Sequence, residues 1–103
     1  MKNILYIDTA DNQKTKVILE INGKKIHKEE SLHHASQNLL PLIAQILKEN
    51  NLALRNLSEI KVNTGSGSFT GLRVGISVAN TLGSQLKIPI NGKPPGQLVL
   101  PTY

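Results

Sequence analysis

Several residue types that point to specialised chemistry are scarce or missing from this chain. It has no cysteine and no tryptophan, and its aromatic residues are Tyr6, Phe69 and Tyr103. Without cysteine, a disulfide framework and thiolate chemistry are excluded. Three aromatic side chains are too few for the base-stacking platform of a single-strand nucleic-acid binder. No apolar run approaches the roughly 20 residues of a membrane helix, so we expect a protein without membrane contact.

Acidic residues are also few. The 103 residues include seven Asp and Glu and twelve Lys and Arg, which gives a net charge of +5 at pH 7. This balance fits affinity for RNA or for an acidic protein, and it does not choose between them. The length predicts one domain. The apolar run at the start ends at Asp8, which is too short for a signal peptide, and we expect a cytoplasmic protein.

The first third of the sequence predicts an antiparallel meander. The continuous apolar run Asn3–Asp8 is typical of a buried central strand. A second strand at Lys16–Ile21 follows, and Asn22–Gly23 is a strong hairpin signal because both residues tolerate positive φ. Lys24–Lys28 then returns as an edge strand whose lysines discourage further pairing.

The rest of the chain alternates between helical and extended patterns. A helix is predicted over Ser36–Glu49, with an apolar stripe formed by Leu39, Leu40, Ile43, Ile46 and Leu47. A strand at Glu59–Asn63, a helix near Thr70–Leu86 and a short strand at Lys87–Ile90 follow. Together these elements predict an α/β lobe with a mixed five-stranded sheet and two main helices. We expect this lobe to cover residues 1–92, and residues 93–103, rich in Pro and Gly, to form an irregular tail.

A loop rich in glycine and serine joins the strand at Glu59–Asn63 to the following helix, for which Thr70 is the predicted N-cap. The N-terminus of a helix favours anions, but the spacing here does not match a phosphate motif. Leu72 and Arg73 replace the lysine and hydroxyl residue of a Walker loop, and the glycines are too widely spaced for the dinucleotide fingerprint. We therefore predict no cofactor site. The residues that come nearest to one are Asp8, Gly65, Gly67, Ser68 and Thr70.

The helix after this loop carries small residues at every fourth position. Gly71, Gly75, Ala79 and Gly83 lie on one helical face, although each glycine costs about 1 kcal/mol relative to alanine. Such a stripe permits another backbone to approach more closely than the usual 8–10 Å or so between helices. In a small chain, we expect that close neighbour to be a partner protein.

No complete set of catalytic residues is recognisable. Ser68 and Thr70 lack an identifiable general base, and His33 and His34 do not form a metal-binding motif such as His-Glu-x-x-His. We expect these two histidines to be polar surface groups. The sequence therefore predicts no catalytic residue, no metal site and no enzyme.

One stretch resembles a known family. The run Gly65-Ser66-Gly67-Ser68-Phe69-Thr70-Gly71-Leu72-Arg73-Val74-Gly75 is similar to the signature of the TsaB (YeaZ) family. Asp8-Thr9, the segment His34–Pro41 and Leu57–Ile60 also match. Ser66 replaces the usual proline, and Ala10 replaces the usual serine. The resemblance covers nearly the whole chain, but only the N-terminal half of a typical member.

The resemblance implies one ribonuclease-H-like lobe of the actin/Hsp70-type ATPase fold. In such a lobe Asp8 can face a metal or phosphate, and the alternative is that it caps the following turn. The family implies a non-catalytic scaffold subunit for modifying adenosine 37 of tRNA to N6-threonylcarbamoyladenosine, paired with a TsaD-like catalytic subunit. A TsaE-like ATPase is a further partner, with ATP and metal on the partner proteins and tRNA contacted only indirectly.

The expected partner interface lies on the two helices. Its predicted residues are Leu39, Ile43, Gly71, Val74, Gly75, Val78 and Ala79. A homodimer through the same helices, or a small nucleotide- or phosphate-binding module of this fold, remains the alternative function.

Overall fold

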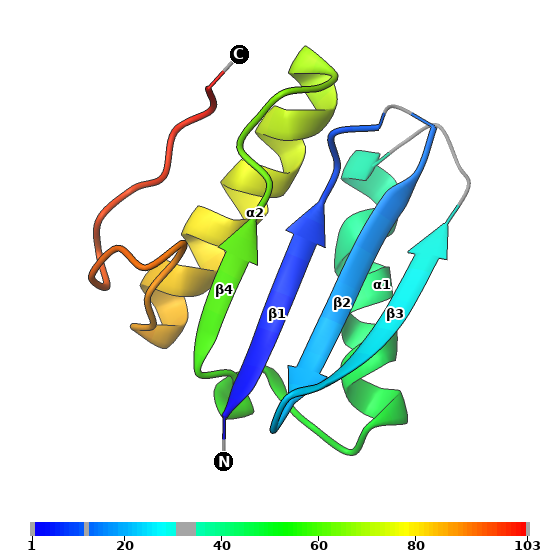
Figure 1. The fold of residues 1–103 in the computed structure, drawn as a ribbon, viewed down its shortest axis with the longest axis vertical. Coiled ribbons are helices and arrows are strands. Elements are labelled where there is room, and N and C mark those ends of the chain that lie inside the picture. Colours follow the sequence, from blue (N-terminus) through cyan, green and yellow to red (C-terminus); the bar gives the residue numbers. More distant parts are fainter. Residues whose placement is uncertain (1, 12, 31–34, 103) are drawn as a thin grey trace.

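The computed structural model describes residues 2–11, 13–30 and 35–102. His33 and His34 lie outside these ranges. The elements are, in order, β1 (Asn3–Asp8), β2 (Thr15–Ile21), β3 (Lys24–Glu30), α1 (Ala35–Glu49), the short 3₁₀ helix η1 (Leu54–Asn56), β4 (Glu59–Val62) and α2 (Phe69–Leu86). The strands form one mixed sheet in the order β3-β2-β1-β4 (Figure 1). β1 pairs antiparallel with β2 and parallel with β4.

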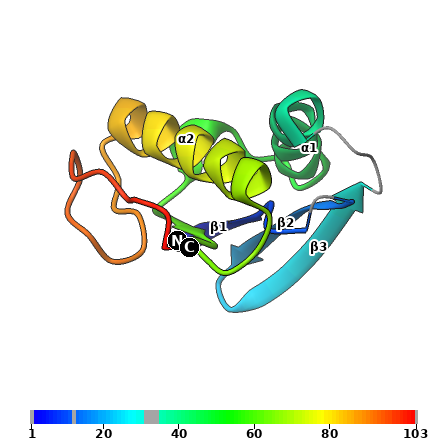
Figure 2. The same ribbon diagram turned by 90° about the horizontal axis from the view of Figure 1, so that it is seen from above.

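Both helices cover the same face of the sheet, and the opposite face carries no helix in the described chain (Figure 2). The alternation of side chains along each strand sends one set of residues toward the helices. The core beneath the helices includes Leu5, Ile7, Val17, Leu19, Leu39, Ile43, Ile46, Ile60, Leu72 and Ile76. None of the described helices is long and apolar enough to cross a membrane.

The predicted hairpin is confirmed. Asn22 and Gly23 both have positive φ, 50° and 88°, as a tight two-residue connection between twisted strands requires. β2 and β3 pair from Ile21 with Lys24 to Thr15 with Glu30. The edge strand β3 therefore extends two residues beyond the predicted Lys28.

The predicted fifth strand is wrong, because Lys87–Ile90 contributes only an isolated bridge between Ile90 and Ile60. Asn91 explains why the pairing stops. Its backbone turns into the left-handed region at φ 51°, and its side-chain amide takes the place of a neighbouring strand. Asn91 Oδ1 accepts from the Val62 N–H at 2.8 Å, and Asn91 Nδ2 donates to the Val62 carbonyl at 3.0 Å.

The helices also differ from the sequence prediction in detail. α2 begins at Phe69 with Ser68 as its N-cap, not Thr70; the Gly71 N–H donates to Ser68 Oγ at 3.3 Å. In α1, Leu42 is buried, whereas Leu40 is 55% exposed. The buried positions of α1 follow the helical spacing i, i+3, i+4, i+7 and i+8 from Leu39. This phase turns Leu40 away from the core.

The segment after residue 92 lies along α2 (Figure 1). Apart from the bridge of Lys93 with Ile90, its described residues 93–102 form no helix or strand. Val99 is nevertheless buried. Its backbone N–H and C=O are both bonded, at 2.9 Å each, by the side-chain amide of Asn80. The Asn80 side chain thus fixes the segment to α2 at Val99.

Candidate functional site

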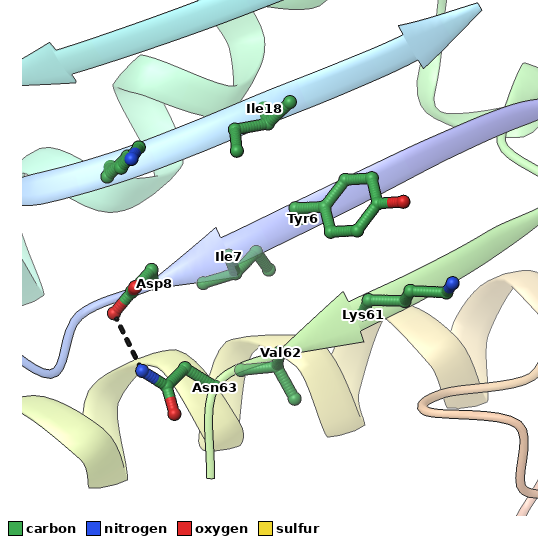
Figure 3. A pocket seen from close by; sticks show the side chains of 8 residues that line it. Tyr6, Ile7, Asp8, Ile18, Lys61, Val62 and Asn63 are labelled. Atoms are coloured by element: carbon green, nitrogen blue, oxygen red, sulfur yellow. Dashed lines mark hydrogen bonds between the residues drawn. The ribbon is translucent and has the colours of Figure 1, made fainter. Parts of the chain in front are cut away.

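The parallel neighbours β1 and β4 bring Asp8 and Asn63 together where both strands end (Figure 3). In open sheets of this kind, ligands bind beyond the carboxyl ends of the strands. Asp8 Oδ1 accepts from the Ala10 N–H at 3.0 Å and from Asn63 Nδ2 at 3.2 Å. Asp8 therefore caps the turn after β1, as the second of the two interpretations predicted.

The glycine loop is closed from two sides by the protein's own chain. A Cβ atom on Gly67 would lie 2.6 Å from the Ala10 Cβ, and one on Gly65 would collide with the backbone of Thr102. The Thr102 N–H donates to the Thr64 carbonyl at 2.7 Å. These contacts make the loop a tightly packed connection.

Several loop donors that an anion would need are already used. The Gly65 N–H donates to Asn63 Oδ1 at 3.1 Å, and the Ser68 N–H donates to the Ala10 carbonyl at 2.7 Å. The Gly71 N–H is taken by the Ser68 hydroxyl. Thr70 is exposed on the first turn of α2. This arrangement supports a plain strand-to-helix connection in the described chain.

A hollow of about 290 Å³ opens on the helix-free face of the sheet beside Asp8. Tyr6 forms one wall, and the ammonium groups of Lys25 and Lys61 lie 5.1 and 5.6 Å from its ring centre. The Tyr6 hydroxyl donates to Glu20 at 2.8 Å. This hydrogen bond raises the pKa of Tyr6, with smaller contributions from desolvation and the neighbouring negative charges.

The hollow does not contain the elements of an active site. Figure 3 shows Asp8 turned toward Asn63, whereas the Tyr6 side chain lies nearer the start of β1. The residues that line the hollow also include Lys16 and Ile18, and none of them is a serine, threonine or cysteine that could act as a nucleophile. Among the described residues, no group of three or more His, Cys, Asp and Glu could hold a metal ion.

The small-residue stripe of α2 packs inside the domain, where it meets the turn after β1. The Thr9 hydroxyl is inserted into the helix: it donates to the Gly71 carbonyl and accepts from the Gly75 N–H, the latter at 3.1 Å. A Cβ at either glycine would collide with Thr9. The close neighbour that these glycines admit is therefore the β1 turn, and our explanation of the stripe as a partner contact was wrong.

The predicted interface residues consequently separate into two groups. Leu39, Ile43 and Ala79 are buried in the core, as are Gly71 and Gly75. Val74 and Val78 instead lie half-buried at the surface. They line a shallow hollow of about 510 Å³ together with Phe69, Thr70, Arg73 and Ser77.

The sequence interpretation missed three residues of the helical surface. Phe69 is 56% exposed, and the Arg73 guanidinium lies 5.3 Å from its ring centre. Leu54, which follows α1, is 39% exposed. The sequence signal for this surface is the low charge of α2, in which Arg73 is the single charged residue among 18.

Comparison with known proteins gives a consistent set of relatives. A family model described as "TsaD: tRNA N6-adenosine threonylcarbamoyltransferase" matches residues 14–92. The TsaB protein of Buchnera aphidicola subsp. Baizongia pistaciae is 33% identical over 89 residues, covering 86% of this chain and 40% of that protein. The TsaB protein of Escherichia coli is 30% identical over 89 residues, covering 86% and 38%. Both carry the name tRNA threonylcarbamoyladenosine biosynthesis protein.

The structure of YeaZ from Pseudomonas aeruginosa matches with a TM-score of 0.82 and 31% identity, covering 87% of this chain and 42% of that one. The chain thus spans about 40% of the length of these relatives. The family model, which runs from residue 14 to residue 92, includes β2, β3, β4, both α-helices and the glycine loop.

Proposed function

Because this chain belongs to the TsaB (YeaZ) family, we propose that it is a non-catalytic scaffold subunit in the synthesis of N6-threonylcarbamoyladenosine at position 37 of tRNA. In this role it pairs with a TsaD-like catalytic subunit. The chain corresponds to one lobe of the actin/Hsp70-type ATPase fold, and its two helices provide the docking surface.

The outward face of α2 is the observation that carries this proposal. A helix facing water on one side normally presents charged or polar residues there; α2 contains Arg73 as its single charge. Around a hollow on its outer side lie exposed Phe69 and half-buried Val74 and Val78, together with the polar residues Thr70, Arg73 and Ser77. Aromatic and arginine side chains are enriched in the centres of protein interfaces, where other charged residues are depleted.

We further propose that catalysis belongs to the partner and not to this chain. Asp8 is engaged by Ala10 and Asn63, and the described residues hold no cluster of potential metal ligands. We propose that nucleotide and metal bind to the partner proteins, which include a TsaE-like ATPase. This chain would then contact tRNA only indirectly, through those partners. We also propose that the protein acts in the cytoplasm, together with its partners in this pathway.

The test is size-exclusion chromatography with light scattering, on the protein alone and mixed with the TsaD-like protein of the same organism. We expect a one-to-one complex that supports tRNA modification. The variant Phe69→Ala should weaken it, because Phe69 lies at the edge of the α2 hollow. Leu98→Ala is the matched control: Leu98 is 62% exposed but lies on the segment after residue 92.

Two outcomes would contradict the proposal. The first is the absence of any complex with the TsaD-like protein while the chain remains folded by circular dichroism. The second is a stable homodimer that Phe69→Ala dissociates and that no TsaD-like protein displaces. The second outcome would assign the same surface to self-association.

A further inference from the structure

One edge of the sheet is formed by β3, the outermost strand, which lies beside β2 (Figure 1). Lys24 follows the two-residue turn and pairs with Ile21, so its N–H and C=O point toward β2. Along an antiparallel strand these groups alternate between the two sides. The N–H and C=O groups of Lys25, His27 and Glu29 therefore point away from the sheet, and no backbone hydrogen bond to a described residue engages them.

This edge is long and accessible. β3 has seven residues, whereas strands average about 5–6. Lys25, His27 and Glu29 are all exposed, and their side chains lie on the helix-free face, where Lys25 approaches the Tyr6 ring. Both helices cover the other face (Figure 2). The row of outward-pointing backbone groups is therefore a template to which another strand can add.

The charges of β3 are ordered along the strand. Lys24 and Lys25 begin it, and Glu29 and Glu30 end it. The strand expected from the sequence stops before these glutamates, so its charged residues are all lysines, which discourage pairing. The two added residues give the edge a positive end and a negative end. Glu29 contacts Lys14 at 3.8 Å, but both side chains are about half exposed, and exposed ion pairs contribute little.

This order of charges makes β3 complementary to a second β3 that runs antiparallel to it. When His27 lies opposite His27, the outward-pointing groups of the two strands face each other, as a hydrogen-bonded ladder requires. Lys25 then lies opposite Glu29 of the second copy, and Lys24 lies opposite Glu30. Directly opposite side chains of unlike charge stabilise a sheet. Such pairs flank the two-fold axis on both sides, as symmetry demands.

Other registers and other occupants fit this edge less well. Two neighbouring registers also keep the outward-pointing groups face to face. One places Lys24 opposite Lys28 and the other places Lys28 opposite its own counterpart, and like charges directly opposite each other are destabilising. A nucleic acid would bring its phosphates toward Glu29 and Glu30. The edge therefore favours a second copy of itself in a single register.

We propose that a second copy of this chain pairs antiparallel with β3, with His27 at the two-fold axis, so that the two sheets become one continuous sheet. This is strand addition between identical chains. The contact is small, so the dimer is weak and depends on protein concentration. β3 lies at the opposite edge of the sheet from β4 and α2 (Figure 1). The inference therefore goes beyond the proposed function and leaves the α2 hollow open.

The first experiment introduces single cysteines into a chain that has none of its own. The Cα atoms of a hydrogen-bonded pair are about 5.5 Å apart, within the disulfide range of about 4.4–6.8 Å. The variant His27→Cys should therefore cross-link two copies under mild oxidation. Lys25→Cys alone and Glu29→Cys alone should cross-link roughly tenfold more slowly or worse, because each residue lies roughly 13 Å from its own counterpart. A mixture of these two variants should cross-link one to the other.

The second experiment measures the Kd of the dimer by sedimentation equilibrium. Lys25→Glu and Glu29→Lys should each raise the Kd roughly tenfold or more, because like charges then lie opposite each other. Mixed in equal amounts, the two variants should dimerise with each other, since opposite charges meet again at every such pair. The control is Lys93→Glu, an exposed lysine on the segment after residue 92, which should leave the Kd unchanged. Circular dichroism verifies that each variant is folded.

Three results overturn this inference, and none of them involves the TsaD-like protein. The first is a protein that remains monomeric at a concentration of about 1 mM. The second is a His27→Cys variant that cross-links no faster than Lys25→Cys, which would exclude the proposed register. The third is a dimer that Glu29→Lys leaves intact and Phe69→Ala dissociates, which would place self-association on α2.

Discussion

Replacing Gly75 by alanine tests whether the glycines of α2 serve the interior of the domain. In an ordinary helix, Gly→Ala stabilises by about 1 kcal/mol. Here the new methyl group would collide with the Thr9 hydroxyl and lie 3.3 Å from Ile7 Cγ2. Because Thr9 connects Gly71 and Gly75 from within the buried helix–sheet contact, the collision cannot be relieved by moving a side chain into solvent.

The magnitude follows from three terms. Displacing the Thr9 hydroxyl loses two hydrogen bonds, each worth about 0.5–1.5 kcal/mol. Overpacking adds about 1–3 kcal/mol, and the gain in helix propensity offsets about 1 kcal/mol. We expect the free energy of unfolding to fall by about 3 kcal/mol, the middle of the range of about 1–5 kcal/mol that these terms give. In a domain of this size that lowers Tm by roughly 10–20 °C.

The assay is thermal and urea unfolding of Gly75→Ala, Thr9→Ala and the double variant. Thr9→Ala removes the hydroxyl with which the new methyl group collides, so the two changes should couple favourably by about 1 kcal/mol or more. Ser77→Ala, at an exposed position of the same helix, is the control and should stay within about 0.5 kcal/mol. A higher Tm for Gly75→Ala, or strictly additive effects, would refute the proposed packing.

Two further predictions concern single hydrogen-bonding side chains. The variant Asn80→Ala removes both hydrogen bonds to the Val99 backbone. Amide hydrogen exchange at Val99 should therefore accelerate, while exchange in β1 stays slow. Equal acceleration at both places would contradict local anchoring by Asn80. The hydrogen bond to Glu20 raises the pKa of Tyr6 in the folded protein. The stability that this bond contributes is therefore fully present at pH values below the ordinary tyrosine pKa of about 10. It is lost as the pH rises through the higher pKa of the folded state. In a Tyr103→Phe background, ultraviolet titration should show ionisation above that value, shifted downward by Glu20→Gln. An unchanged midpoint in Glu20→Gln would contradict the assignment.

Features that depend on neighbouring residues could be predicted from the sequence. The Asn22–Gly23 hairpin and the order of strands and helices follow from backbone preferences and from the period of the apolar residues. The run Gly65–Gly75 also carries the signature on which the resemblance to the family rested. The role of Asp8 as a turn cap was one of two alternatives, because a carboxylate two residues before an N–H has a short-range partner within reach.

Features that depend on residues distant in sequence were decided by the tertiary structure. A glycine stripe indicates a close neighbour, but the pattern alone could not tell a partner from Thr9, which lies 62 residues before Gly71. Asn91 ends the sheet by bonding Val62, 29 residues away. The sequence interpretation assigned Leu40 to the buried stripe, and the packing of α1 on the sheet shows that Leu42 is buried in its place, although the helical spacing from Leu39 already favoured Leu42. Composition and periodicity specify which residues favour burial; the partner that each one meets is set by the way the elements pack together.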